Sequence, residues 1–151
     1  MSVKLSVRSM PRVIHDLQKA VDKVKGAGKV TVGVHQAHAN DGREGGEPNN
    51  PTIGAINQFG TEHIPARPWL DKGVEAGAEK ITKTAIELFK RGEDPRRVMD
   101  ALGNVAVGEV QQYITDFDSP PNAPSTVNRK GSSNPLINTG ALRQSITYEV
   151  H

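Results

Sequence analysis

Three histidines and the carboxylates near them in sequence are the residues of this chain best suited to chemistry. The set is His35, His38, His63, Asp41, Glu44 and Glu62. Imidazole and carboxylate groups suit zinc or manganese, but the spacing matches no known signature of metal ligands. His35 and His38 also stand where a predicted strand passes into a loop, so the two rings need not share a face. We interpret these histidines as solvated loop residues and predict no metal site.

A short glycine and lysine segment, residues 26–31, has the ending of a phosphate-binding loop. Lys23 occupies the place of the opening glycine, and the predicted helix precedes the strand instead of following it. The two glycines more simply end that helix. The chain has no Gly-x-Ser-x-Gly elbow and no cysteine nucleophile, and no pair of acids stands out by spacing. We therefore predict that the protein is not an enzyme, with no catalytic residues and no cofactor. A metal hydrolase, the alternative, would carry stoichiometric metal.

Two adjacent cations, Arg129 and Lys130, lie in a polar stretch that could hold phosphate. The segment around them is rich in proline and has no aromatic residue for stacking on bases. A flexible arm that docks on neighbouring protein explains these features better. A small nucleic-acid-binding module, with tight and salt-dependent affinity for DNA, is the alternative from a different class.

Arg67 stands between Pro65 and Pro68, whose rings restrict the backbone on both sides. Its guanidinium could bond internal helix carbonyls or a carboxylate, or pair with a neighbouring subunit, and we favour the internal role. Trp69 and Phe59 are expected to anchor their helices to the core. Aromatic residues beside an arginine are also typical of interface hot spots.

The elements that must position these residues follow from hydrophobic periodicity. Alternation predicts strands over residues 2–8, 29–35 and 145–151, the last two paired in an antiparallel sheet. Spacing of three and four residues predicts an amphipathic helix over 13–24, a short helix over 51–59, and two long helices over 68–91 and 95–117. Leu70, Val74, Ala78, Ile81, Ala85 and Leu88 form the predicted apolar face of the first long helix.

Two stretches show no apolar periodicity. Residues 39–50 are rich in glycine, asparagine and acids and are predicted to form a flexible surface loop. Residues 118–135 hold four prolines and are predicted to form an extended arm with no core of its own. The whole chain, 1–151, is then one α+β domain, a small antiparallel sheet packed against two long helices and shorter helices.

Composition narrows the functional classes further. A formal charge of +2 with interspersed signs argues against wholesale binding to nucleic acid. No apolar run approaches the roughly 20 residues of a membrane span, and we expect no membrane partner. The aromatic content of 4% is low for a self-sufficient monomer, which is compatible with a core completed by other subunits.

Two blocks of sequence, residues 56–70 and 134–146, set apolar anchors beside prolines, glycines and an arginine. In this order, with the strand over 32–34 and the stretch over 122–126, they resemble the tail-component or tail-completion proteins of tailed bacteriophages. Trp69 stands where that family more usually has phenylalanine, and residues 39–50 have no firm counterpart there.

The resemblance implies a structural virion protein of the neck or upper tail, made in the host cytoplasm. It implies a homo-oligomeric ring, expected to be a hexamer, that completes the tail and helps join it to the head. Expected partners are the terminator, head-closure or connector and tail-tube proteins, with non-specific contact to DNA in the channel. A tail-terminator or head-closure ring is the alternative in the same assembly. The candidate interface residues are Arg67, Trp69, Pro124, Thr126, Arg129 and Lys130.

Overall fold

The computed structural model describes residues 28–151 together with His15, Lys19, Asp22 and Gly26. The predicted strand over 2–8 lies outside the described residues, as does most of the predicted helix over 13–24. The remaining elements form an α+β arrangement, as predicted.

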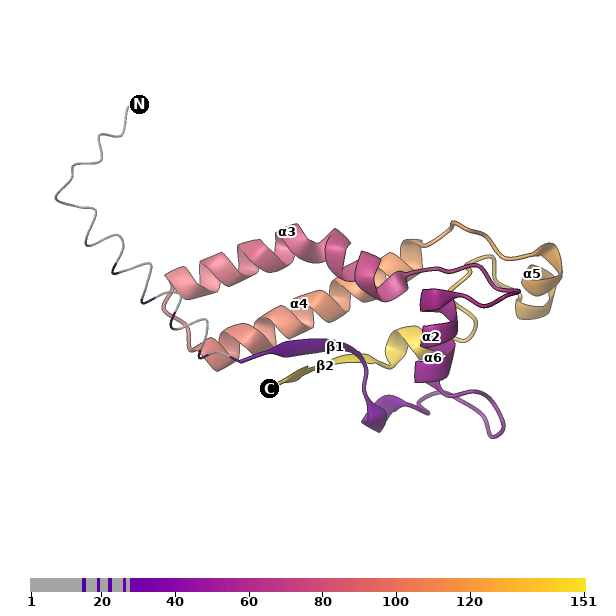
Figure 1. Ribbon diagram of the computed structural model, residues 1–151, viewed down its shortest axis with the longest axis horizontal. Coiled ribbons are helices and arrows are strands. Elements are labelled where there is room, and N and C mark those ends of the chain that lie inside the picture. The colour runs from indigo at the N-terminus through magenta and orange to yellow at the C-terminus, as the bar shows by residue number, and fades with distance from the viewer. Residues whose placement is uncertain (1–14, 16–18, 20–21, 23–25, 27) are drawn as a thin grey trace, which may run out of the picture.

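Two long antiparallel helices, α3 (Trp69–Lys90) and α4 (Pro95–Asp116), run along the length of the molecule (Figure 1). Asp94 begins α4, because its side chain accepts hydrogen bonds from the backbone N–H groups of Arg96 and Arg97. Pro95 fits the first helical position, where no intrahelical bond is lost. Both helices and the short turn between them were predicted.

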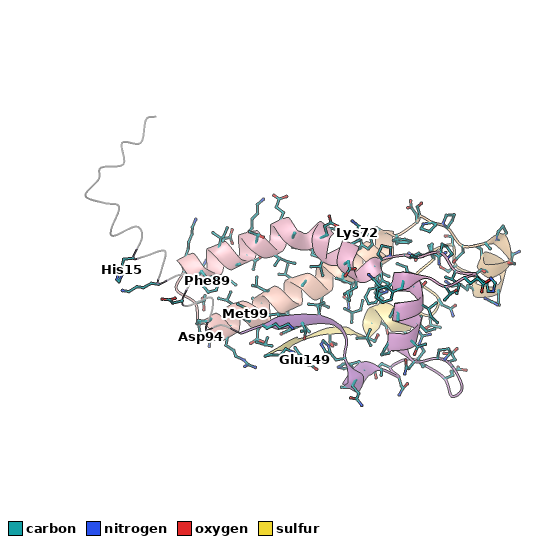
Figure 2. All side chains as sticks on the ribbon, viewed as in Figure 1. His15, Lys72, Phe89, Asp94, Met99 and Glu149 are labelled. Carbon is teal, nitrogen blue, oxygen red and sulfur yellow. The ribbon has the colours of Figure 1, made fainter. Side chains whose placement is uncertain are left out.

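Strands β1 (Val30–Val34) and β2 (Ile146–Val150) pair antiparallel, with Val32 opposite Tyr148. Both strands pack on α4, on the side away from α3 (Figure 1). Glu149 lies on the outer side of the strand pair (Figure 2). The pairing of 29–35 with 145–151 is therefore confirmed, although the two segments are more than a hundred residues apart.

The packing face of α3 differs from the predicted one at two of its six positions. Val74 is more than one third exposed, and Ala78 is also exposed, whereas Leu70, Ile81, Ala85 and Leu88 are partly buried. Gly73 and Gly77 face α4 in their place: a Cβ on Gly73 would lie 2.9 Å from the Val110 Cα. Glycine has no side chain to count in a hydrophobic pattern, so the periodicity selected the adjacent residues at these two turns.

The main hydrophobic cluster draws on four parts of the chain: α3, α4, β2 and the segment that leads into β2. Its buried members are Trp69, Val110, Ile114, Leu136, Leu142 and Ile146. Within the described part of the chain, none of the helices combines the length and apolar character that crossing a bilayer needs.

The predicted extended arm over 118–135 is wrong in its middle, where α5 (Pro124–Lys130) forms. Pro124 supplies a preset φ at the first helical position, and Gly131, at φ +67°, ends the helix in the left-handed region. Seven residues without an apolar stripe give no periodic signal, which explains the error. No residue of α5 is buried, so the prediction that this segment has no core of its own is confirmed.

Of the predicted loop over 39–50, residues 39–49 contain no helix or strand, as predicted, and follow the 3₁₀ turn η1 (Gln36–His38), whereas Asn50 already belongs to the next helix. The turns of the loop close around Asn50, which is fully buried. The Asn50 side chain donates to the carbonyls of His38 and Asp41 and accepts from the Arg43 Nε. The loop thus has a polar centre that its composition does not show.

Candidate functional site

The junction between α2 (Asn50–Phe59) and α3 is a tight reversal of the chain. Gly60 ends α2 at φ +74°, and a Cβ there would lie 2.7 Å from the backbone of Ala66. The returning chain then hydrogen-bonds to α2, with the Arg67 N–H 2.6 Å from the Asn57 carbonyl oxygen. Only glycine fits this position, because the returning strand of chain occupies the space of any side chain.

Trp69 locks the start of α3 against α2. Its Nε1 donates to the Gly54 carbonyl at 2.9 Å, and its side chain is 4% exposed. A Cβ on Gly54 would lie 3.0 Å from the indole ring, so the glycine admits the close approach. The predicted anchoring role of Trp69 is confirmed.

Gln58 supplies the first turn of α3 with a cap that Pro68 cannot give. Its Oε1 accepts from the Leu70 N–H at 3.0 Å, and its Nε2 donates to Asp71 at 2.7 Å. One buried amide therefore joins the end of α2 to the first turn of α3.

The Arg67 guanidinium fastens this junction to the segment over 118–135. The residue is 5% exposed; its Nε donates to the Pro120 carbonyl at 3.0 Å and its Nη2 to the Pro121 carbonyl at 3.2 Å. Burial lowers the pKa of Arg67 below its ordinary value. The favoured internal role agrees with this geometry, but the acceptors are carbonyls of an irregular segment and not of a helix.

Asn134 fixes the other sequence block to the end of α4. Its amide nitrogen donates to the carbonyls of Ile114 and Thr115, and its Oδ1 accepts from the N–H groups of Leu136 and Ile137. Two of the last four carbonyls of α4 are thereby satisfied. Trp69 packs in one buried cluster with Leu136 and Leu142, so residues 56–70 and 134–146 meet at one end of the molecule.

A cavity of about 790 Å³ opens at this end, between α2, the junction, α5 and residues 135–142. Four of the six candidate interface residues line it: Arg67, Thr126, Arg129 and Lys130. Trp69 lies instead in the core, and Pro124 begins α5 without lining the cavity.

The cavity is strongly cationic. Burial, followed by the positive charges of Arg67 and Arg129, lowers the pKa of Lys130. Arg43 and His63 also contribute to its lining. No sequence pattern singles out Arg43, because it lies in a loop whose composition indicates only an exposed surface segment.

Phe59 contradicts its prediction as a core anchor, because its side chain is 77% exposed. It is the last residue of α2, where the chain turns away toward Gly60, so its ring projects from the junction. Ile64 in the same junction is 37% exposed.

The histidines do not gather. The His35 Nδ1 lies 2.8 Å from the Thr147 Oγ1, and the His38 Nδ1 lies 2.7 Å from Asp41, whereas His63 lies at the cavity. Over the part of the chain that the structure describes, no group of three or more His, Cys, Asp or Glu side chains is placed to hold a metal ion.

Comparison with protein-family models, with curated proteins and with solved structures finds no match to this chain. A rigid junction, an exposed phenylalanine beside it and a cationic cavity are features of a binding surface.

Proposed function

We propose that this protein is a structural component of the neck or upper tail of a tailed bacteriophage, where it forms an oligomeric ring and binds other neck and tail proteins without catalysis. The resemblance of residues 56–70 and 134–146 to tail-completion proteins supports the phage assignment. Trp69 of the first block belongs to the same buried cluster as Leu136 and Leu142 of the second, which agrees with a single functional unit built from both blocks.

The observation that carries the oligomeric part of the proposal is the exposure of Phe59. The chain has only three phenylalanines, and one of them is 77% exposed on a rigid junction. A large exposed aromatic residue on a fixed backbone gives contact area with little loss of side-chain entropy on binding. We therefore place Phe59 in the contact between copies of the chain.

Native mass spectrometry of the full-length protein, with Phe59→Ala as the test variant, examines this placement. We expect Phe59→Ala to weaken self-association by about tenfold or more without lowering the melting temperature, because the ring is exposed in the subunit. Ile86→Ala is the matched control, since Ile86 is a 48% exposed aliphatic residue on α3. Equal weakening by both variants, or by Ile86→Ala alone, would place the contact elsewhere.

Cryo-electron microscopy of phage particles that carry the tagged protein tests the assignment itself. A symmetric collar between head and tail is the expected result. A collar at the head side only would favour the head-closure alternative, and absence of the protein from particles would refute a structural role.

A further inference from the structure

The cavity at the junction gathers cations from separate parts of the chain. Arg67 comes from the junction before α3, Arg129 and Lys130 from α5, and Arg43 from the loop before α2. Burial, and then the positive charges of Arg67 and Arg129, lower the pKa of Lys130. Like charges held together cost free energy unless an anion joins them.

No protein anion fills that role among the described residues. No Asp or Glu of the described chain lines the cavity, and none lies within ion-pair distance of Arg67, Arg129 or Lys130. Glu47 approaches Arg43 at 3.9 Å from outside the cavity. The cavity is thus electrostatically complementary to a negative group.

Arg67 also has an unused donor. Its Nε and Nη2 bond to carbonyls, whereas its Nη1 makes no hydrogen bond to the described residues. In the described part of the chain no fully buried side-chain nitrogen lacks a partner, so this Nη1 keeps some exposure to solvent. A guanidinium held by two bonds is preorganised to donate to a carboxylate.

The uncharged residues that line the cavity indicate which kind of anion fits. Ile53, Ile56 and Ile64 line the same cavity, and no Phe, Tyr or Trp side chain of the described residues does. A nucleic-acid backbone would leave the aliphatic wall uncovered and would find only the His63 ring for base stacking. A peptide offers a carboxylate and an aliphatic side chain a few ångströms apart, and a volume of about 790 Å³ is sufficient for a short peptide stretch.

We propose that this cavity binds an acidic and aliphatic peptide segment of a partner protein, with a carboxylate at Arg67, Arg129 and Lys130 and an aliphatic side chain against the three isoleucines. The inference stands on the cavity alone and holds whether or not the protein belongs to a phage neck.

Nuclear magnetic resonance titration of the full-length protein tests the site with a defined probe. The probe is a peptide of alternating aspartate and leucine, and its control is the same peptide with asparagine for aspartate. We expect the acidic peptide to shift the backbone amide signals of Thr126, Arg129 and Asn138 with a Kd of about 1 mM or tighter, and the asparagine peptide to bind about tenfold more weakly.

Paired charge variants distinguish peptide binding in the cavity from general electrostatic attraction of the peptide to the protein. The double variant Arg129→Gln with Lys130→Gln should raise the Kd of the acidic peptide by about tenfold. The double variant Lys90→Gln with Arg91→Gln should change this Kd by less than about twofold. Both pairs are adjacent cations at the end of a helix, and the control pair lies at the α3–α4 turn beside the labelled Phe89 and Asp94 (Figure 2). Since α5 has no buried residue, the cavity pair should remain folded.

Three results would overturn the proposal. The first is the absence of cavity shifts at about 5 mM acidic peptide, and the second is equal binding of the asparagine peptide. The third is tighter binding of a thymidine dodecanucleotide to the same signals, which would assign the cavity to nucleic acid. A refuted peptide site would leave self-association through Phe59 untouched, so the two proposals fail separately.

Discussion

Polar side chains at single positions hold the irregular parts of this molecule in place. Asn50 closes the loop before α2, Gln58 joins α2 to α3, and Asn134 joins α4 to the segment before β2. Each of them satisfies backbone groups that no helix or strand would satisfy. Their amides therefore hold the irregular segments by hydrogen bonds, in addition to the packing of the apolar core residues.

Asn50→Ala should destabilise the fold by about 2–3 kcal/mol, because it leaves the His38 and Asp41 carbonyls and the Arg43 Nε without their partner. Asn49→Ala is the control: Asn49 caps α2 through one bond to the Thr52 N–H and should cost about 1 kcal/mol. Chemical denaturation of both variants measures the difference. Equal losses would show that the loop gains nothing from the buried amide.

Trp69 combines apolar burial with one hydrogen bond, and two variants separate these contributions. Trp69→Ala should cost about 3–5 kcal/mol through the cavity it leaves. Trp69→Phe should cost about 1–2 kcal/mol, because the Gly54 carbonyl then loses its donor while most of the packing remains. Thermal melts and denaturant titrations measure both values, and an unchanged melting temperature for Trp69→Ala would contradict the buried position.

Among the elements, those with strong local signals were predictable and those held by distant contacts were not. Asp94 and Pro95 predict the start of α4, and the alternation over 29–35 predicts β1. Helix α5 has too few residues for a periodic pattern, and the packing face of α3 depends on glycines that carry no hydropathy signal. For the site, the sequence predicted the importance of Arg67, Arg129 and Lys130 but not their meeting, because Arg67 bonds to carbonyls 53 and 54 residues away.

Helix α3 approaches α4 closely where it carries Gly73 and Gly77. A Cβ on Gly77 would lie 2.6 Å from the Glu109 side chain, so Gly73→Ala and Gly77→Ala should each destabilise by about 1–3 kcal/mol through overpacking. Gly108→Ala is the control in α4, where a Cβ meets nothing within 4 Å and alanine should stabilise the helix by about 0.5–1 kcal/mol. Opposite signs in thermal melts would confirm the close approach; stabilisation by all three changes would contradict it.

At the scale of the whole molecule, the cavity shares part of its lining with the core, namely Leu136 and Leu142, and takes one wall from outside the core. The buried cluster spans α3, α4, β2 and the segment that leads into β2, whereas α5 adds a wall to the cavity and no buried residue. Figure 1 shows α5 at the end of the molecule opposite the α3–α4 turn. The α5 wall can therefore change without removing a residue from the buried cluster.

Replacing residues 124–131 with a short glycine and serine linker should leave the fold intact and lower the free energy of unfolding by about 1 kcal/mol or less. The reason is that Arg67 can still donate its hydrogen bonds to the Pro120 and Pro121 carbonyls. Circular dichroism and thermal melts measure this. A cooperative loss of the whole fold would contradict the position of α5 outside the core.

The paired helices α3 and α4 each contain 22 residues, which corresponds to a rod about 33 Å long. The cationic cavity lies beyond one end of this rod and the α3–α4 turn forms the other, so any assembly that touches both ends receives a fixed spacing. Helix length, and not side-chain detail, sets that distance. Inserting two matched helical turns into α3 and α4 should therefore lengthen this distance by about 11 Å without altering either end.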